Sequence, residues 1–230
     1  MANDDDVNHD AQLLYRWSVG DNNAGRVLYD RHYRVVQRFF RSKVPEASED
    51  LSQKTWMAVH RSGHNMRKKG SFRAFLLGIA RNQLLHHFRS NGRDRLVFNG
   101  EEHCCEDLRT GPFGRVAKCE RYKHLVKALR RIPLDHQILI ELYYWERMNS
   151  REISEVLGIP PSTIRQRKKR AMKELRDALQ TLLNDDQRVE TTMMGLNTWA
   201  EEIKRTIEDL GDEDGATDAE QEDGGGNDDR

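Results

Sequence analysis

The stretch NSREISEVLGIPPSTIRQRKKRAMKEL, residues 149–175, restricts the fold more than any other part of the chain. Asn149 or Ser150 can cap a first helix, and Gly158 offers the positive φ that ends it. Pro161 is excluded from a helix interior but suits the first turn of a second helix. The stretch therefore predicts two helices joined by a tight turn.

Apolar residues recur on one face of each of these two helices. They are Ile153, Val156 and Leu157 in the first helix, and Ile164, Ala171, Met172 and Leu175 in the second. The other faces of the second helix carry six bases between Arg165 and Lys173. A buried face backed by a basic one is the geometry of a helix-turn-helix motif whose second helix can enter the major groove of DNA.

Side chains near the start of the second helix suit DNA chemically. Arg165 can make a bidentate contact with guanine and Gln166 with adenine, whereas Thr163, Arg167 and Arg170 are better placed to hold phosphates. A solvated basic helix face is the plain alternative, but turn residues, apolar spacing and charge together favour DNA binding. The residues predicted to bind DNA here are Ser162, Thr163, Arg165, Gln166, Arg167, Lys169 and Arg170.

Charge is segregated along the 230-residue chain, although the formal net charge is zero. Residues 61–95 hold nine bases and one acid, and residues 150–176 hold eight bases and three acids. Residues 208–230 hold eleven acids and a single base. Two basic segments and an acidic end are typical of a nucleic-acid-binding protein with a solvated tail.

Several kinds of protein and site are disfavoured. Cys104, Cys105 and Cys119 do not make a disulfide framework, and together with His103 they lack the spacing of a zinc site. There is no Gly-rich phosphate loop and no GxSxG or HExxH motif, so we expect a binding protein, not an enzyme, with no cofactor and no metal. An acidic start and no apolar run of about 20 residues predict a cytoplasmic, nucleoid-associated protein without membrane insertion.

The remaining patterns predict an all-α chain of two small helical domains joined by a flexible linker. Helical periodicity from Asp21 to Pro45, from Glu46 and from Ser71 builds the first domain, and a second helical set begins near Cys119. The parts expected are an acidic arm at 1–10, a domain at 11–90, an acidic linker at 91–118, a domain at 119–183 and an extension at 184–230.

The helix predicted within SFRAFLLGIARNQLLHHFR has a core face and a basic face. The residues expected to point inward are Phe72, Phe75, Leu76, Ile79 and Leu84. Those expected to remain available outside are Arg73, Arg81, Asn82, His86 and Arg89.

The segment DHQILIELYYWERMNSREISEVLGIPPSTIRQRKKRAMKELRDAL resembles the fourth region of bacterial RNA polymerase sigma factors of the extracytoplasmic-function (ECF) type. Three earlier segments resemble, in order, successive parts of the second region of that family: QLLYRWSVGDNNAGRVLYDRHYRVVQRFF, DLSQKTWMAVHR and SFRAFLLGIARNQLLHHFR. The resemblance covers about residues 11–90 and 119–183. It implies a protein that binds core RNA polymerase, directs it to promoters, helps to melt them, and often pairs with an anti-sigma factor.

The resemblance also assigns surfaces. In such sigma factors the helix that corresponds to EDLSQKTWMAVHR docks on the clamp of the polymerase's largest catalytic subunit, which implies core binding by Asp50, Gln53, Lys54 and Met57. The next helix and the basic loop before it resemble the part that opens and reads the minus-ten promoter element. This implies DNA binding by Lys68, Lys69, Arg73, Arg81, Asn82, His86 and Arg89. The helix-turn-helix would read the minus-thirty-five element.

Several positions depart from the family pattern, among them Pro160 and Pro161, which replace the usual Ser or Asp cap. His86 stands where many relatives carry Asp, and Lys168 stands where relatives have an apolar residue, so that its stem could snorkel to water. Two alternatives stay open: a helix-turn-helix regulator that acts without core polymerase, and a degenerate sigma-like protein that sequesters polymerase or an anti-sigma factor.

The extension beyond Asn184 lies outside the resemblance. TTMMGLNTWAEEIKRTIEDL predicts a short amphipathic helix, and the last residues have the composition of a disordered tail. A docked extension with the stripe Trp199, Ile203, Ile207 and Leu210 is the alternative to an inert or weakly modulatory one, which we favour.

Overall fold

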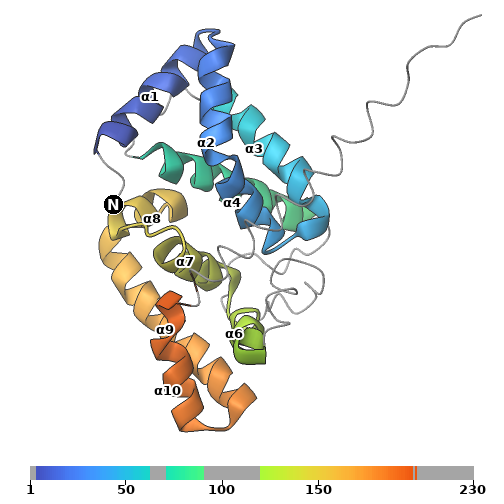
Figure 1. The fold of residues 1–230 in the computed structure, drawn as a ribbon, viewed down its shortest axis with the longest axis vertical. Helices are drawn as coiled ribbons and strands as arrows, with labels where there is room; N and C mark the ends of the chain where they lie inside the picture. The colour runs from blue at the N-terminus through green and yellow to red at the C-terminus, as the bar shows by residue number, and fades with distance from the viewer. Residues whose placement is uncertain (1–3, 63–70, 91–119, 199, 201–230) are drawn as a thin grey trace, which may run out of the picture.

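The computed structural model describes residues 4–62, 71–90, 120–198 and 200, and this part of the chain is helical, without a strand (Figure 1). The predicted all-α class is confirmed. The linker at 91–118, the loop with Lys68 and Lys69, and the three cysteines lie outside the described residues. The helices are α1 (Asp4–Ser18), α2 (Asn22–Arg41), the 3-10 helix η1 (Pro45–Ala47), α3 (Ser48–Ser62), α4 (Phe72–Ser90), α6 (Glu120–Leu129), α7 (Leu134–Tyr144), α8 (Ser150–Leu157), α9 (Pro161–Leu183) and α10 (Asp186–Met194).

The N-terminal domain consists of α1 to α4. The Asp21 side chain accepts a hydrogen bond from the Ala24 N–H at 3.2 Å and caps α2, as the sequence predicts. Leu28, Val36 and Phe40 of α2 are fully buried. Pro45 does not end α2, which stops at Arg41 and is followed by η1.

Gly25 is where α1 and α2 approach closely. A Cβ atom at this position would lie 2.4 Å from Nε1 of Trp17 in α1. The indole therefore lies directly on the α2 backbone. Only a residue without a side chain permits this packing.

The C-terminal domain consists of α6 to α10 and contains the predicted helix-turn-helix motif. Asn149 caps α8 in a capping box with Glu152, and Gly158 ends the helix at a φ of 70°. Pro161 is the first residue of α9, as expected. Ile153, Val156, Leu157 and Ile164 are buried, so the apolar spacing of the sequence correctly predicts which faces of the two helices point inward.

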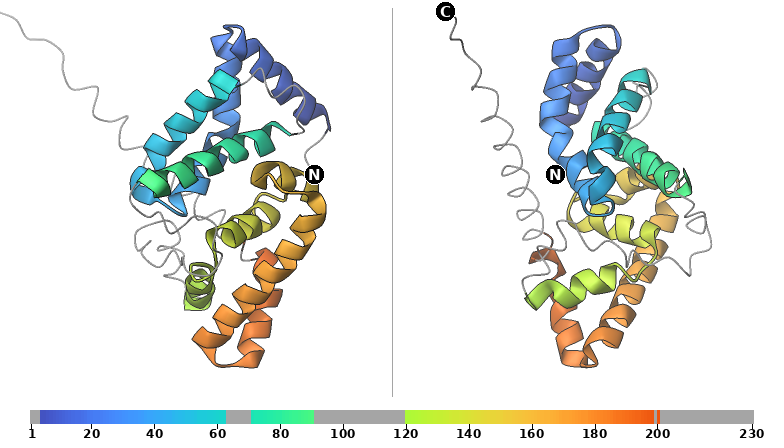
Figure 2. Two further views of the ribbon diagram at one scale, coloured as in Figure 1. Left: turned by 180° about the vertical axis from the view of Figure 1, so that it is seen from behind. Right: turned by 90° about the vertical axis from the view of Figure 1, so that its right-hand side faces the viewer.

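The two domains pack directly against each other. Helix α8 lies against α4, with α7 beside it (Figures 1 and 2). One hydrophobic core joins residues of α1 to α4 with residues of α7, α8 and the first turn of α9. At Gly78 of α4, a Cβ atom would lie 3.8 Å from Cα of Val156 in α8. The sequence does not predict this contact between domains.

A second hydrophobic core holds the extension against α6, α7 and α9. Val189 of α10, Leu196 and Ala200 are buried in it together with Leu175 and Leu179 of α9. Helix α10 begins at Asp186, earlier than the helix predicted at 191–210, and the Asp185 side chain caps it. Residues 191–194, 196–198 and 200 are helical, and the rest of the predicted helix, apart from Gly195, lies outside the described residues. The described part of the extension is therefore an integral part of the C-terminal domain. The stripe from Trp199 to Leu210 lies outside the described residues.

Candidate nucleic-acid interface

The first turns of α9 present the side chains that the sequence predicts for base contacts. Arg165, Gln166 and Lys169 are exposed there. Arg170 is exposed too, and its Nε donates to Glu174 at 3.0 Å. Within the predicted set, Ser162 is exposed and Thr163 and Arg167 are half-buried. The structure thus gathers these residues at one end of one helix.

The turn before α9 is fixed by local hydrogen bonds. The Ser154 hydroxyl donates to the Ile159 carbonyl at 2.5 Å, and the Gly158 N–H donates to the Ser154 carbonyl at 2.9 Å. Together with the capping box of α8, these bonds set the direction in which α9 leaves the turn. The exposed face of α9 that carries Arg165, Gln166 and Lys169 therefore rests on a rigid support.

The Lys168 side chain, whose stem was predicted to snorkel to water, is half-buried and lies over an exposed aromatic ring of α7. Its Nζ lies 3.1 Å from the ring centroid of Tyr143 in α7. Its ammonium is thus held over the negative face of an aromatic ring. At this position, where the family resemblance leads one to expect an apolar residue, a cation of α9 therefore packs against α7.

Helix α4 presents a divided surface. Asn82, His86 and Arg89 are exposed, as predicted. Arg73 and Arg81 are not available outside, and that prediction is wrong for this arrangement of the domains. Phe75 and Ile79, which were expected inside, are only half-buried.

Acidic residues of the C-terminal domain hold both arginines. The Arg81 guanidinium donates to Asp135 at 2.8 Å, and the Arg81 side chain is only 12% exposed. Arg73 pairs with Glu146. Burial, reinforced by the nearby Arg38 cation, lowers the pKa of Arg73 to about 10, which still leaves it charged at neutral pH.

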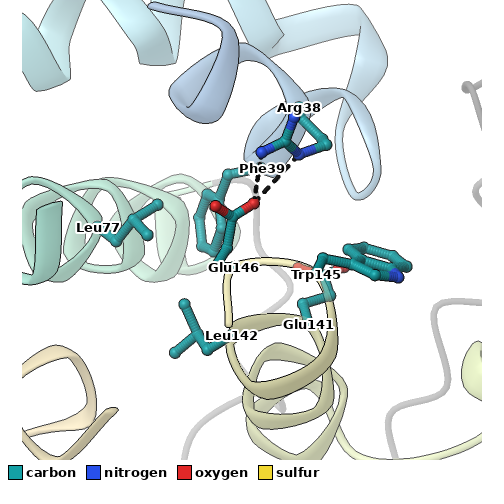
Figure 3. A pocket seen from close by; sticks show the side chains of 7 residues that line it. All are labelled: Arg38, Phe39, Leu77, Glu141, Leu142, Trp145 and Glu146. Carbon is teal, nitrogen blue, oxygen red and sulfur yellow. Dashed lines mark hydrogen bonds and ion pairs between the residues drawn. The ribbon is translucent and has the colours of Figure 1, made fainter. Parts of the chain in front are cut away.

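Glu146 joins the two domains at the edge of a small pocket (Figure 3). Its Oε1 accepts from Arg38 Nε at 3.1 Å and from the terminal nitrogen of Arg38 at 2.6 Å. Arg38 comes from α2, so one carboxylate gathers cations from two helices of the N-terminal domain. Both side chains are buried. Burial strengthens the ion pair between Arg38 and Glu146, and it makes any polar atom of the pair that lacks a partner costly.

A second buried ion pair connects the domains nearby. Lys43, which is fully buried, pairs with Glu141 of α7. The Lys43 ammonium also donates to the Phe39 carbonyl at 3.0 Å and to the Ser42 hydroxyl at 2.9 Å. Burial raises the pKa of the Glu141 carboxyl, and the Lys43 cation opposes that rise.

Sequence reasoning missed Asp135, Glu141 and Glu146. The available signal was the pair of acids Glu141 and Glu146 within the apolar run ILIELYYWE. A charged residue on a buried helix face is tolerated only if a cation pairs with it. The cations come from residues far away in the chain. No local pattern identifies them.

The residues predicted to bind core polymerase lie together on α3. Asp50, Gln53, Lys54 and Met57 are all exposed, and Lys54 donates to Asp50 at 2.6 Å. Trp56 of the same helix is buried. The C-terminal domain does not cover this surface.

Comparisons with known proteins agree with the resemblance. Residues 28–94 match the family model for Sigma-70 region 2, and residues 128–177 match the model for Sigma-70, region 4. The chain is 28% identical to the ECF RNA polymerase sigma factor BldN of Streptomyces coelicolor over 190 residues, which cover 81% of this chain and 70% of BldN. It is 24% identical to the ECF RNA polymerase sigma factor SigX of Bacillus subtilis, over 72% of this chain and 90% of SigX.

The chain belongs to the ECF-type RNA polymerase sigma factors. The family prediction is confirmed, and with it the function of directing RNA polymerase to promoters. This ECF sigma factor also resembles a solved structure of CnrH in complex with the cytosolic domain of CnrY. The TM-score is 0.54 at 24% identity, over 77% of this chain and 99% of CnrH. At that identity the likeness concerns the fold.

The described residues contain neither a membrane-spanning helix nor a cluster of metal ligands. Among them, no helix is long and apolar enough to cross a membrane. Likewise, in the ranges that the structure describes, there is no group of three or more His, Cys, Asp or Glu side chains that could hold a metal ion.

Proposed function

We propose that this ECF sigma factor binds core RNA polymerase through α3, reads the minus-thirty-five element with α9 and captures the melted minus-ten element with α4. The observation that carries the proposal is the reading face at the start of α9. There Arg165 and Gln166 are exposed on a helix whose direction is fixed by the capped turn before it.

Base reading at the minus-thirty-five element follows from side-chain chemistry. The Arg165 guanidinium offers two parallel donors to the acceptors of guanine, and the Gln166 amide offers a donor and an acceptor to adenine. Arg167 and Lys169 flank them and would hold phosphates, which position the helix without selecting sequence.

Capture of the minus-ten element needs a surface that prefers single-stranded DNA. The Asn82 amide is exposed on α4 and can bond to the edge of an unstacked base, while Arg89 can follow the backbone. Such a surface melts DNA without nucleotide hydrolysis, because it binds the open state more tightly than the duplex. This sigma factor would then act as a binding protein, together with polymerase on nucleoid DNA.

We infer a protein antagonist as a further partner. CnrH, whose fold this chain shares, was solved with the cytosolic domain of CnrY bound to it. That likeness supports an anti-sigma factor for this chain. The α3 face would be a favourable target, since an antagonist bound there would exclude the polymerase.

Transcription by sigma-free bacterial core polymerase tests the proposal. Upstream fragments of the source genome serve as templates, with and without the protein, and transcript starts are sequenced. Starts that depend on the protein and share two spaced motifs support the proposal. Duplex binding without polymerase and without new starts would favour the helix-turn-helix regulator, and binding to core without new starts would favour the sequestering protein.

Variants of two exposed residues make the assignment specific. Gln53→Ala on α3 should weaken association with core polymerase and leave the preferred promoter sequence unchanged. Gln166→Ala on α9 should leave association with core intact and relax the base preference at one minus-thirty-five position. The reverse result would contradict the assignment of the two surfaces.

A further inference from the structure

We propose that the contact between the two domains is an autoinhibitory closure, in which acidic residues of the C-terminal domain take the place of DNA phosphates on α4. This inference rests on the proposed function of α4. Asp135 holds Arg81 at 2.8 Å, and Glu146 holds Arg73. The family resemblance assigns both arginines to minus-ten DNA, and the structure finds both paired with acids of the other domain.

The closed arrangement cannot read both promoter elements at once. By their names, the elements lie about 25 base pairs apart, which at roughly 3.4 Å per base pair is about 85 Å of duplex. In the structure, Leu77 and Leu84 of α4 share one hydrophobic core with Ile164 in the first turn of α9. Helix α8 packs against both α4 and α9, so the two reading helices lie within one helix of each other, and the domains must separate before both can reach DNA.

The contact replaces a phosphate with a carboxylate of the same charge. A guanidinium binds either anion through parallel N–H donors. Arg81 is 12% exposed and Arg73 is 29% exposed in their side chains, so neither offers DNA an open face while its acid is in place. DNA and the C-terminal domain compete for the same donors.

The closure is selective. The core-binding surface on α3 remains exposed, with Asp50, Gln53 and Met57 open to a partner. Arg165 and Gln166 on α9 are exposed as well. The closed arrangement therefore covers part of the minus-ten surface and leaves the core-binding surface exposed. Binding then has an order: the chain docks on core polymerase first, and separation of the domains afterwards uncovers Arg73 and Arg81.

A reversible cross-link tests this order on the full chain. The Gly78→Cys/Val156→Cys pair is placed to join α4 to α8 by a disulfide at the point where a Cβ atom on Gly78 would lie 3.8 Å from Cα of Val156. Cys104, Cys105 and Cys119 are replaced by serine so that only the new pair can oxidise. Each single-cysteine variant receives the same oxidant as a control.

The readouts are transcription from a start found with the unmodified chain and co-elution with core polymerase. The oxidised double variant should give background transcript levels while still co-eluting with core, and reduction should restore its transcription. Equal transcript yields before and after reduction would overturn the closure. Loss of core binding in the cross-linked chain would overturn the proposed order. Absence of transcripts with the unmodified chain itself would instead count against the proposed function.

A second variant does not depend on the cross-link. Asp135→Asn removes the acid that holds Arg81, and Asp30→Asn changes the net charge equally at an exposed site on α2. The probe is oligo(dT), bound by the full chain without polymerase. Affinity should rise more for Asp135→Asn than for Asp30→Asn. An equal rise in affinity for oligo(dT) in both variants would show that only the net charge matters and would contradict the closure.

Discussion

The buried pair Lys43–Glu141 can be tested by removing one charge. Lys43→Met keeps most of the side-chain volume but leaves the Glu141 carboxylate buried, with the Ser42 hydroxyl at 3.3 Å as its remaining close donor. Lys43 is fully buried and Glu141 is 4% exposed in its side chain. Water therefore cannot replace the lost ammonium while the domains stay together.

The size of the effect follows from this burial. Breaking a buried ion pair on one side costs about 3–5 kcal/mol, because an uncompensated charge remains. Replacing both partners with apolar residues is often neutral or stabilising by about 1–4 kcal/mol. Lys43→Met should therefore be strongly destabilising, and Lys43→Met/Glu141→Met should recover most or all of the loss.

The dependence on pH has a definite sign. Burial raises the folded-state pKa of Glu141 above its unfolded value, so a protonated Glu141 favours folding. The stabilisation that protonated Glu141 gives to the folded state is fully present below the pKa of Glu141 in the unfolded chain. It is lost as the pH rises through the pKa of Glu141 in the folded protein. The deficit of Lys43→Met should accordingly shrink as the pH falls from neutral towards the unfolded pKa of Glu141.

Urea denaturation followed by circular dichroism measures these free energies of unfolding. Lys54→Met is the matched control, since it removes the same charge from an exposed pair and should cost at most about 1 kcal/mol. A Lys43→Met loss no larger than that of the control would refute the reasoning. So would a deficit that grows as the pH is lowered.

Three further outcomes are expected. Deleting residues 185–230 should destabilise the C-terminal domain by about 3 kcal/mol or more, because two large apolar side chains and an alanine leave its core, and a chain that ends at Ala200 is the control in thermal unfolding. In promoter binding by the polymerase complex, Arg165→Ala should relax preference at one base pair at a cost of about 1–3 kcal/mol, whereas Arg167→Ala should weaken all sequences alike. Asn149→Ala should lower the free energy of unfolding by about 1 kcal/mol in urea, and no change would contradict the capping role of Asn149.

The helix-turn-helix was predictable because its determinants are local. Asn149, Gly158 and Pro161 act within one or two turns of where they stand in the sequence. Periodicity over a few turns likewise assigns Ile153 and Ile164 to the core. For such elements, the local sequence is sufficient to predict where the helices begin and end and which face is buried.

The contact between domains was not predictable because its determinants are distant. Lys43 and Glu141 are 98 positions apart, and Arg73 and Glu146 are 73 apart. The two acids stand in an apolar run, but the cations that pair with them look like ordinary surface charges in their own segments. The wrong expectation for Arg73 has this cause: periodicity tells which face of α4 avoids the core of its own domain, but not whether another domain covers that face.

The ammonium of Lys168 over the Tyr143 ring has a consequence for how promoter binding responds to salt. A cation contributes to the salt dependence only if it displaces a condensed counterion from the duplex. Lys168 is already committed to an aromatic face beneath the helix, so counting every base in α9 overstates the number of counterions released. Each cation withheld makes the slope of log affinity against log salt shallower by about 0.9. The Lys168 side chain therefore contributes to the contact between α7 and α9 and, while it stays on the Tyr143 ring, displaces no counterion from DNA.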